Sequence, residues 1–253
     1  MDTVTCDTTS SLRSAVQADG FAFVHGRALR AMLESIGSLA DWNRFADSWN
    51  ELEIDFCMAD GGRYRRRRYA VYECRTAACI TRQPHQPHYQ PVDYNPLNGG
   101  VSRWFEPVET DVGESATMRT ILGSCHALFV EPGRPNRAWH VEVHQFRIEA
   151  LRDEVGRPTP EGLHRDGVDY VLVLLIQRLN LADGTTMIYG AGGRHLGHFT
   201  LTDPFDAALV DDSRVFHGVT PVRALDPQSP AHRDVLVVTF AAAGPDARRD
   251  ASA

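Results

Sequence analysis

The sequence contains no lysine, so all 26 of its basic residues are arginines. This absence excludes catalysis through a lysine Schiff base, and any bound anion must be held by arginine, whose planar guanidinium can donate two parallel hydrogen bonds. A basic excess is absent as well, because 33 acidic residues give the chain a formal net charge of −7. Nucleic-acid-binding domains usually carry a net positive charge, so we expect no nucleic-acid partner.

Long hydrophobic runs are also missing. No stretch approaches the roughly 20 consecutive apolar residues that a transmembrane helix requires. The first residues, MDTVTCDTTSSLRSAV, lack the basic-then-apolar pattern of a signal peptide. The five cysteines are scattered, and Cys74 and Cys79 have the spacing of neither a zinc knuckle nor a redox pair. We therefore expect a cytoplasmic protein with reduced thiols and no membrane partner.

The apolar patterns predict a helical N-terminal part followed by a β-sheet core. Helical spacing is found in LRSAVQA and over about residues 28–53, whereas later segments are short and rich in β-branched and aromatic residues. Seven such segments are separated by Gly, Pro and Asp, namely RRYAVYE, AWHVEVHQFRIEA, YVLVLLIQRLNL, TTMIYG, HFTL, AALVDDSRVF and DVLVVTFAAA. This spacing is typical of an antiparallel sandwich or barrel. A length of 253 residues fits a single domain of this kind.

The stretch EGLHRDGVDYVLVLL has a histidine and a carboxylate two residues apart. In an extended strand, His164 and Asp166 would point to the same side. With one more histidine they would form the two-histidine, one-carboxylate site of non-haem iron(II) oxygenases. His217, at the end of an apolar strand in SRVFHGVTPV, can supply that ligand. Arg233 opens the next strand, HRDVLVVTF, where it can pair with the far end of a dicarboxylate chelated by the metal.

A second histidine–carboxylate pair, His140 and Glu142, is the competing candidate. Its partners would be His195 and His198 around the turn GAGGRHLGH, and no arginine on a strand follows at a comparable spacing. Pairs with this spacing also arise by chance in a chain of this composition. This pair is more simply interpreted as one face of a sheet strand.

Three blocks in the order HRDGVDYV, VFHGVTPV and HRDVLVVTF resemble the Fe(II)- and 2-oxoglutarate-dependent dioxygenases, specifically the bacterial L-isoleucine dioxygenase-like family of amino-acid hydroxylases. The arginine run RYRRRRYAVY, the loop QPVDYNPLNGGVSRWFEP and the strand WHVEVHQFRI extend the resemblance. It implies one dioxygenase domain over residues 1–253 that is mainly β. Its core over about 60–242 would be a double-stranded β-helix, or jelly roll, with helices at about 1–55 packed on one side.

The resemblance also implies a ligand set and a reaction. His164, Asp166 and His217 would bind Fe(II), and Arg233 would bind the distal carboxylate of 2-oxoglutarate. Arg233 lies farther beyond His217 than the corresponding arginine of many such enzymes, and the loop ALDPQSPAH accounts for the difference; Arg223 is the alternative. With O₂ as the third reactant, the implied reaction is C–H hydroxylation that yields succinate and CO₂. The intact carboxylate of Asp166 favours hydroxylation over halogenation.

The expected substrate is a free L-amino acid or a similar small molecule. Two alternatives remain open: the same chemistry on a carrier-bound, peptidyl or nucleotide intermediate, and a cupin-like metal protein without oxygenase activity. In the arginine run, strand alternation would place Arg65 and Arg67 on one face and Arg66 and Arg68 on the other. Arg65 or Arg67 is our candidate for the substrate carboxylate, although a solvated edge strand would carry the same charges. Gln145 is a candidate for a hydrogen bond to a substrate or co-substrate oxygen.

Overall fold

The structure is a computed structural model that describes residues 8–130, 138–150 and 154–243. A seven-stranded antiparallel sheet forms its largest layer, in the order β1-β9-β5-β12-β4-β2-β3. The strands are β1 (Phe21–Val24), β2 (Arg65–Thr76), β3 (Cys79–Arg82), β4 (Trp139–Glu149), β5 (Tyr170–Leu179), β9 (Ala207–Asp211) and β12 (His232–Ala242).

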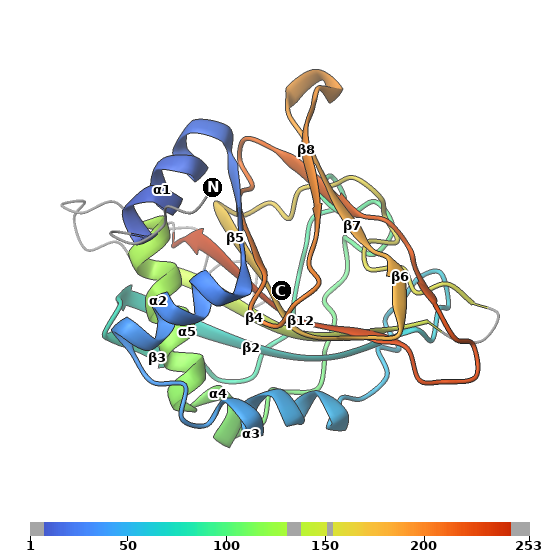
Figure 1. The fold of residues 1–253 in the computed structure, drawn as a ribbon, viewed down its shortest axis with the longest axis horizontal. Helices are drawn as coiled ribbons and strands as arrows, with labels where there is room; N and C mark the ends of the chain where they lie inside the picture. Colours follow the sequence, from blue (N-terminus) through green and yellow to red (C-terminus); the bar gives the residue numbers. More distant parts are fainter. Residues whose placement is uncertain (1–7, 131–137, 151–153, 244–253) are drawn as a thin grey trace.

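Two smaller antiparallel sheets complete the β core. One has the order β10-β7-β8 and the other pairs β11 with β6. Their strands are β6 (Leu181–Asp183), β7 (Thr185–Tyr189), β8 (His195–Thr200), β10 (Phe216–Val219) and β11 (Val222–Ala224). In Figure 1, β7 and β8 stand apart from β2, β4 and β12 on the other side of the barrel. This is the expected jelly roll, and each of the seven predicted segments contains strand residues.

Helices cover the outer face of the main sheet (Figure 1). They are α1 (Thr8–Asp19), α2 (Gly26–Ile36), α3 (Trp42–Asp47), the 3-10 helix η1 (Ser48–Glu51), α4 (Thr110–Gly113) and α5 (Ala116–Phe129), with a 3-10 turn η2 (Ala191–Gly193) between β7 and β8. The described N-terminal helices agree with the prediction. No helix in the described ranges is long and apolar enough to span a membrane.

Helix α5 is not predicted by the sequence patterns. Most of its residues are buried, so it lacks the polar stripe that makes a surface helix recognisable. Its start is marked by Ser115, whose hydroxyl accepts a hydrogen bond from the backbone N–H of Met118 at 3.0 Å. The helix packs into the same apolar core as α1 and α2.

Alternation along the central strands separates this core from an internal cavity. On β4, Val141 and Val143 are buried in the core under the helices, whereas Glu142 and His144 line the cavity. On β12, Leu236 and Val238 belong to the core and Val237 to the cavity wall. The cavity between the sheets is the place where polar side chains of these strands gather.

Candidate active site

The structure brings His164, Asp166 and His217 together beside the cavity. Their candidate ligand atoms all lie within 4.8 Å of one another. The backbones of His164 and His217 are joined by two hydrogen bonds, since the N–H of each residue donates to the carbonyl of the other at 2.9 Å. Asp166 lies in the bend before β5 and not in a strand, so strand alternation is not what aims its carboxylate.

The hydrogen bonds of His164 leave a metal-binding nitrogen free. Its Nδ1 is 3.1 Å from the carbonyl oxygen of Gly162, and a carbonyl can only accept, so Nδ1 carries the proton of the neutral ring. The lone pair is then on Nε2, which faces Oδ1 of Asp166 at 3.6 Å. Nε2 of His217 lies 3.5 Å from Oδ2 of the same carboxylate. Two nitrogens and a carboxylate in this arrangement fit a divalent cation such as Fe(II).

Without a metal, the three side chains form a cluster of opposite charges, and a metal that binds there would displace the second proton of His164. Burial alone would lower the pKa of His164, but Asp166 raises it to about 9. Burial and the charge of His164 lower the pKa of His217 to about 4. Burial opposes ionisation of Asp166, yet contact with both histidines keeps its pKa well below the ordinary value. The carboxylate is thus an anion that a bound cation would neutralise.

Asp212 holds the backbone at Asp166 in place through hydrogen bonds. It is buried, and its carboxylate accepts backbone N–H groups of Asp166 at 2.9 Å, Gly167 at 2.8 Å and Val168 at 3.1 Å. Gly167 closes this bend with a φ of +82°, which favours glycine. Burial and the neighbouring Asp166 raise the pKa of Asp212 to about 6. This anchoring residue is missed by the sequence patterns, which show it only as part of AALVDDSRVF.

Replacing Asp212 with asparagine is expected to weaken Fe(II) binding by roughly 10- to 100-fold. An amide has one accepting oxygen, so at least one of the three N–H groups of residues 166–168 would lose its partner. Anaerobic Fe(II) titration of the wild type and the variant measures the effect. The matched control is Asp211→Asn, because Asp211 accepts from Ser213 at the surface. Equal iron affinity in all three proteins would contradict the anchoring role.

Arg233 lies in the same cavity with unused hydrogen-bond donors. Its side chain on β12 is 2% exposed, and its Nε and Nη2 have no hydrogen-bond partner within the described residues. Burial and the nearby Arg178 lower its pKa to about 10, so the guanidinium stays charged at neutral pH. A buried guanidinium with free donors is suited to a carboxylate. The alternative, Arg223, forms an exposed ion pair with Asp183 at 3.8 Å and does not line the cavity.

The arginine run divides between two faces of β2. Arg65 and Arg67 are buried and line the cavity. Arg66 and Arg68 point the other way and pair with glutamates of β4 and of the segment before α4. The sequence alone does not determine which face of this strand points into the cavity. In the structure it is the face that contains Arg65 and Arg67.

Three buried arginines lie at this end of the cavity, and Asp55 interacts with all of them. Asp55 lies 2.7 Å from Arg65 and 3.9 Å from Arg67. Arg103, from the loop before α4, also lines the cavity, and its Nε has no hydrogen-bond partner in the described part of the chain. This end of the cavity therefore gathers guanidinium groups, two of which keep an Nε without a hydrogen-bond partner in the described residues.

Gln145 does not face the cavity, which corrects the expectation for this residue. It belongs to the face of β4 that lies under the helices, and its side-chain amide donates to Oγ of Ser48 at 2.9 Å. Alternation is the reason, because its neighbours His144 and Phe146 take the cavity side. Gln145 is therefore not among the residues we propose for substrate binding.

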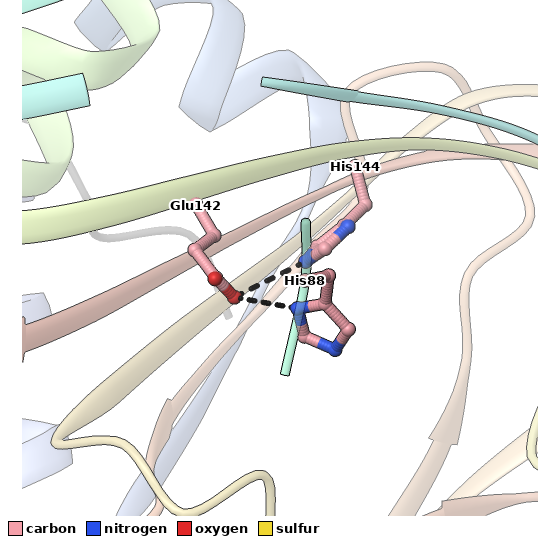
Figure 2. Close-up of side chains that lie close together, drawn as sticks. All are labelled: His88, Glu142 and His144. Carbon is pink, nitrogen blue, oxygen red and sulfur yellow. Dashed lines mark hydrogen bonds and ion pairs between the residues drawn. The ribbon is translucent and has the colours of Figure 1, made fainter. Parts of the chain in front are cut away.

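Glu142 has partners other than those considered from the sequence. His195 and His198 lie together on β8 and do not line the cavity. Instead, Glu142 lies close to His144 of its own strand and to His88 of the proline-rich loop after β3 (Figure 2). Nδ1 of His88 lies 3.1 Å from Oε2 of Glu142, and Nε2 of His144 lies 3.7 Å from the same oxygen.

Comparison with known proteins agrees with this architecture. Residues 46–239 match the family model described as 2OG-Fe dioxygenase. A 3(1)-hydroxy-L-isoleucine 4-dioxygenase of Pantoea ananatis is 26% identical over 233 residues, which cover 87% of this chain and 91% of that protein. The crystal structure of a bsmA homologue from Methylobium petroleophilum PM1 is 36% identical, with a TM-score of 0.83 and coverage of 93% of this chain and 94% of that one. IDO from Bacillus thuringiensis is 18% identical, with a TM-score of 0.73 and coverage of 94% of this chain and 100% of that one, and it shares the fold.

These matches define the class of enzyme. The matched family model spans most of the chain, and the family uses Fe(II), 2-oxoglutarate and O₂. The alternative of a cupin-like metal protein without oxygenase activity is thereby excluded. The jelly roll, the cavity and the sequence match together lead to one conclusion: this chain belongs to the 2OG-Fe dioxygenase family.

Proposed function

We propose that the protein hydroxylates a C–H bond of a free L-amino acid or a closely similar small molecule. His164, Asp166 and His217 would hold Fe(II), and Arg233 would hold the distal carboxylate of 2-oxoglutarate, which is converted to succinate and CO₂. The observation that carries this assignment is the buried guanidinium of Arg233, whose Nε and Nη2 have no hydrogen-bond partner among the described residues. It lies in the cavity that the three metal-ligand candidates also line. Bound Fe(II) and 2-oxoglutarate supply the oxidising chemistry with O₂; the protein's residues bind, orient and exclude water.

The size and the lining of the cavity suit a small and partly aliphatic substrate. Its volume of about 310 Å³ is that of a site for small molecules. Branched and aromatic side chains of both sheets line part of it, namely Phe146, Val171, Val173, Val219, Val235 and Val237. The Pantoea relative is named for a hydroxylated L-isoleucine, an amino acid with a branched aliphatic side chain. An aliphatic L-amino acid is therefore the first substrate to test.

Arg67 is better placed than Arg65 to bind the substrate carboxylate. Arg65 is held against Asp55, because its Nε donates to Oδ2 at 2.8 Å and its Nη2 lies 2.7 Å from the same oxygen in an ion pair. Arg67 is 3.9 Å from that carboxylate, and its Nε has no hydrogen-bond partner in the described part of the chain. Its guanidinium packs 3.6 Å from the ring centroid of Phe105, which fixes its direction. Burial and the charge of Arg65 lower its pKa to about 9, so it is a cation at neutral pH.

Replacing Arg67 with methionine is expected to raise the KM for the amino-acid substrate by about 30-fold or more, because a desolvated charge pair would be lost. The KM for 2-oxoglutarate should stay close to that of the wild type. Steady-state assays of succinate formation measure both constants. Arg68→Met is the control, since Arg68 lies on the opposite face of β2 and pairs with Glu109. An unchanged amino-acid KM in the Arg67 variant would contradict the assignment.

A turnover screen tests the proposed function as a whole. The protein with Fe(II), 2-oxoglutarate and O₂ would be incubated with each L-amino acid, beginning with L-isoleucine. We expect succinate together with a product that has gained one oxygen atom, measured by mass spectrometry. If free amino acids gave no product and a peptidyl, nucleotide or carrier-bound amino acid did, the alternative of a tailoring enzyme would replace the proposal.

A further inference from the structure

Glu142 is a half-buried anion whose ion-pair partners in the described part of the chain include no arginine. Its side chain is 15% exposed and lines the cavity. Among the described residues, its ion-pair partners are three histidines, His88, His140 and His144. Burial, together with the charge of Arg67, lowers the pKa of His144 to about 3, and burial likewise lowers the pKa of His88. Both rings are therefore neutral at pH 7 and supply no positive charge to Glu142.

Although burial opposes its ionisation, Glu142 stays ionised. Contacts with His88 and the neighbouring histidines hold its pKa well below the ordinary value. A charge withdrawn this far from water is unfavourable unless it acquires a partner. The site thus has the electrostatic character of a receptor for a cation.

The tautomer of His144 argues against a metal ion as that cation. Nη2 of Arg67 lies 2.8 Å from Nδ1 of His144, and because arginine only donates, Nδ1 must accept. The proton of the neutral ring is then on Nε2, the atom that faces Glu142 in Figure 2. This is the reverse of His164, whose Nδ1 donates to a carbonyl, so that Nε2 is the nitrogen available to a metal. In the Glu142 cluster, Nδ1 of His88 and Nε2 of His144 both carry a proton toward the carboxylate, so neither offers a lone pair to a metal shared with it.

Glu142 still has room for a hydrogen-bonding cation. Its Oε1 accepts from the hydroxyl of Tyr69 at 2.5 Å, and its Oε2 from His88 at 3.1 Å. The contacts to His140 and His144, at 3.5 and 3.7 Å, are long. Since a carboxylate offers about four lone-pair directions, each oxygen retains accepting capacity.

We propose that Glu142 binds the α-ammonium group of the substrate while Arg67 binds its α-carboxylate. Arg67 contacts one nitrogen of the His144 ring and Glu142 faces the other, so one imidazole separates the two charges. The charged ends of a single α-amino acid can span such a distance. This inference rests on the proposed function and narrows it: the enzyme would select free zwitterionic amino acids, and an N-acylated or peptidyl amine would be rejected.

Glu161 is the rival for this role. It also lines the cavity, and its Oε2 is buried and unpartnered in the described part of the chain. However, its Oε1 lies 3.6 Å from Nε2 of His164, beside the proposed iron site. Arg103 also interacts with it electrostatically, so Glu161 has a permanent cation nearby, whereas Glu142 has none among its ion-pair partners.

Calorimetric binding to the protein loaded anaerobically with Fe(II) and 2-oxoglutarate tests the ammonium site. The probes are L-isoleucine, L-isoleucinamide, which has the ammonium but no carboxylate, and N-acetyl-L-isoleucine, which has the carboxylate but no ammonium. We expect Glu142→Gln to weaken the binding of L-isoleucine and of L-isoleucinamide by about tenfold or more, since a charge-assisted contact is lost. Affinity for 2-oxoglutarate should not change. Glu149→Gln, on the outer face of the same strand, is the matched control.

Several results would overturn the ammonium site. These are equal binding of the ammonium probes by wild type and Glu142→Gln, no binding of either ammonium probe to wild type, and binding of N-acetyl-L-isoleucine as tight as that of L-isoleucine. Loss of ammonium binding in Glu161→Gln but not in Glu142→Gln would transfer the role to Glu161. A second equivalent of divalent metal that disappears in Glu142→Gln would establish a metal site instead. Glu142-dependent binding without oxidation of any amino acid would refute the proposed function and leave the ammonium site standing.

Discussion

Replacing Arg233 with glutamine is expected to raise the KM for 2-oxoglutarate by about 100-fold or more. Arg233 is 2% exposed, so a carboxylate that reaches it is shielded from water on the protein side. Loss of one partner from a buried, hydrogen-bonded charge pair costs about 2–5 kcal/mol, and each 1.4 kcal/mol is roughly a factor of ten. Steady-state assays with varied 2-oxoglutarate measure the change.

The stability of the ligand-free protein separates this effect from a folding defect. Nε and Nη2 of Arg233 have no hydrogen-bond partner in the described residues, so removing the charge should not lower the Tm of the ligand-free protein. The rise in Tm that 2-oxoglutarate gives the wild type should disappear, because that rise depends on affinity. Arg223→Gln, whose arginine lies outside the cavity, should keep both properties. A normal KM in the Arg233 variant would contradict the role.

Replacing Asp166 with alanine is expected to abolish turnover and to weaken Fe(II) binding more than the roughly 10- to 100-fold that loss of a ligand's hydrogen-bond partner costs. Asp166 supplies the only carboxylate of the proposed site, and its charge is what raises the pKa of His164. Without it, only the two histidines of the proposed site remain as ligands, and the anionic charge that favours a cation there is lost. Anaerobic Fe(II) titration and the succinate assay measure the two effects. Retained iron affinity would contradict the assignment of Asp166.

The grouping of His164, Asp166 and His217 could be predicted because it follows from order along the chain. Strands that pair in a jelly roll bring the segment before β5 next to β10, and the three sequence blocks mark both places. Arg233 could be predicted for the same reason, since β12 pairs with both β4 and β5 in the main sheet. The strands themselves could be predicted from their β-branched and aromatic content.

Other parts of the site could not be predicted, because they depend on which way the side chains of a strand point and on packing between segments far apart in the sequence. Alternation separates Arg65 and Arg67 from their neighbours, but only the fold shows which set faces inward, and the same uncertainty made the expectation for Gln145 wrong. His88 comes from a loop whose path follows from a backbone pairing with Arg103. Asp212 acts through three backbone N–H groups far away in sequence, which leave no trace in side-chain patterns.

Two clusters of similar composition make the central claim directly testable. His164, Asp166 and His217 are proposed to bind Fe(II), whereas His88, Glu142 and His144 are proposed to recognise the substrate. The decisive measurement is an anaerobic titration of the Fe(II) protein with 2-oxoglutarate, following the weak visible absorption band of the chelate. The band should form in the wild type and in Glu142→Gln and be absent in Asp166→Ala. A band that survives in Asp166→Ala, or that is lost only in Glu142→Gln, would contradict the assignment of the iron site.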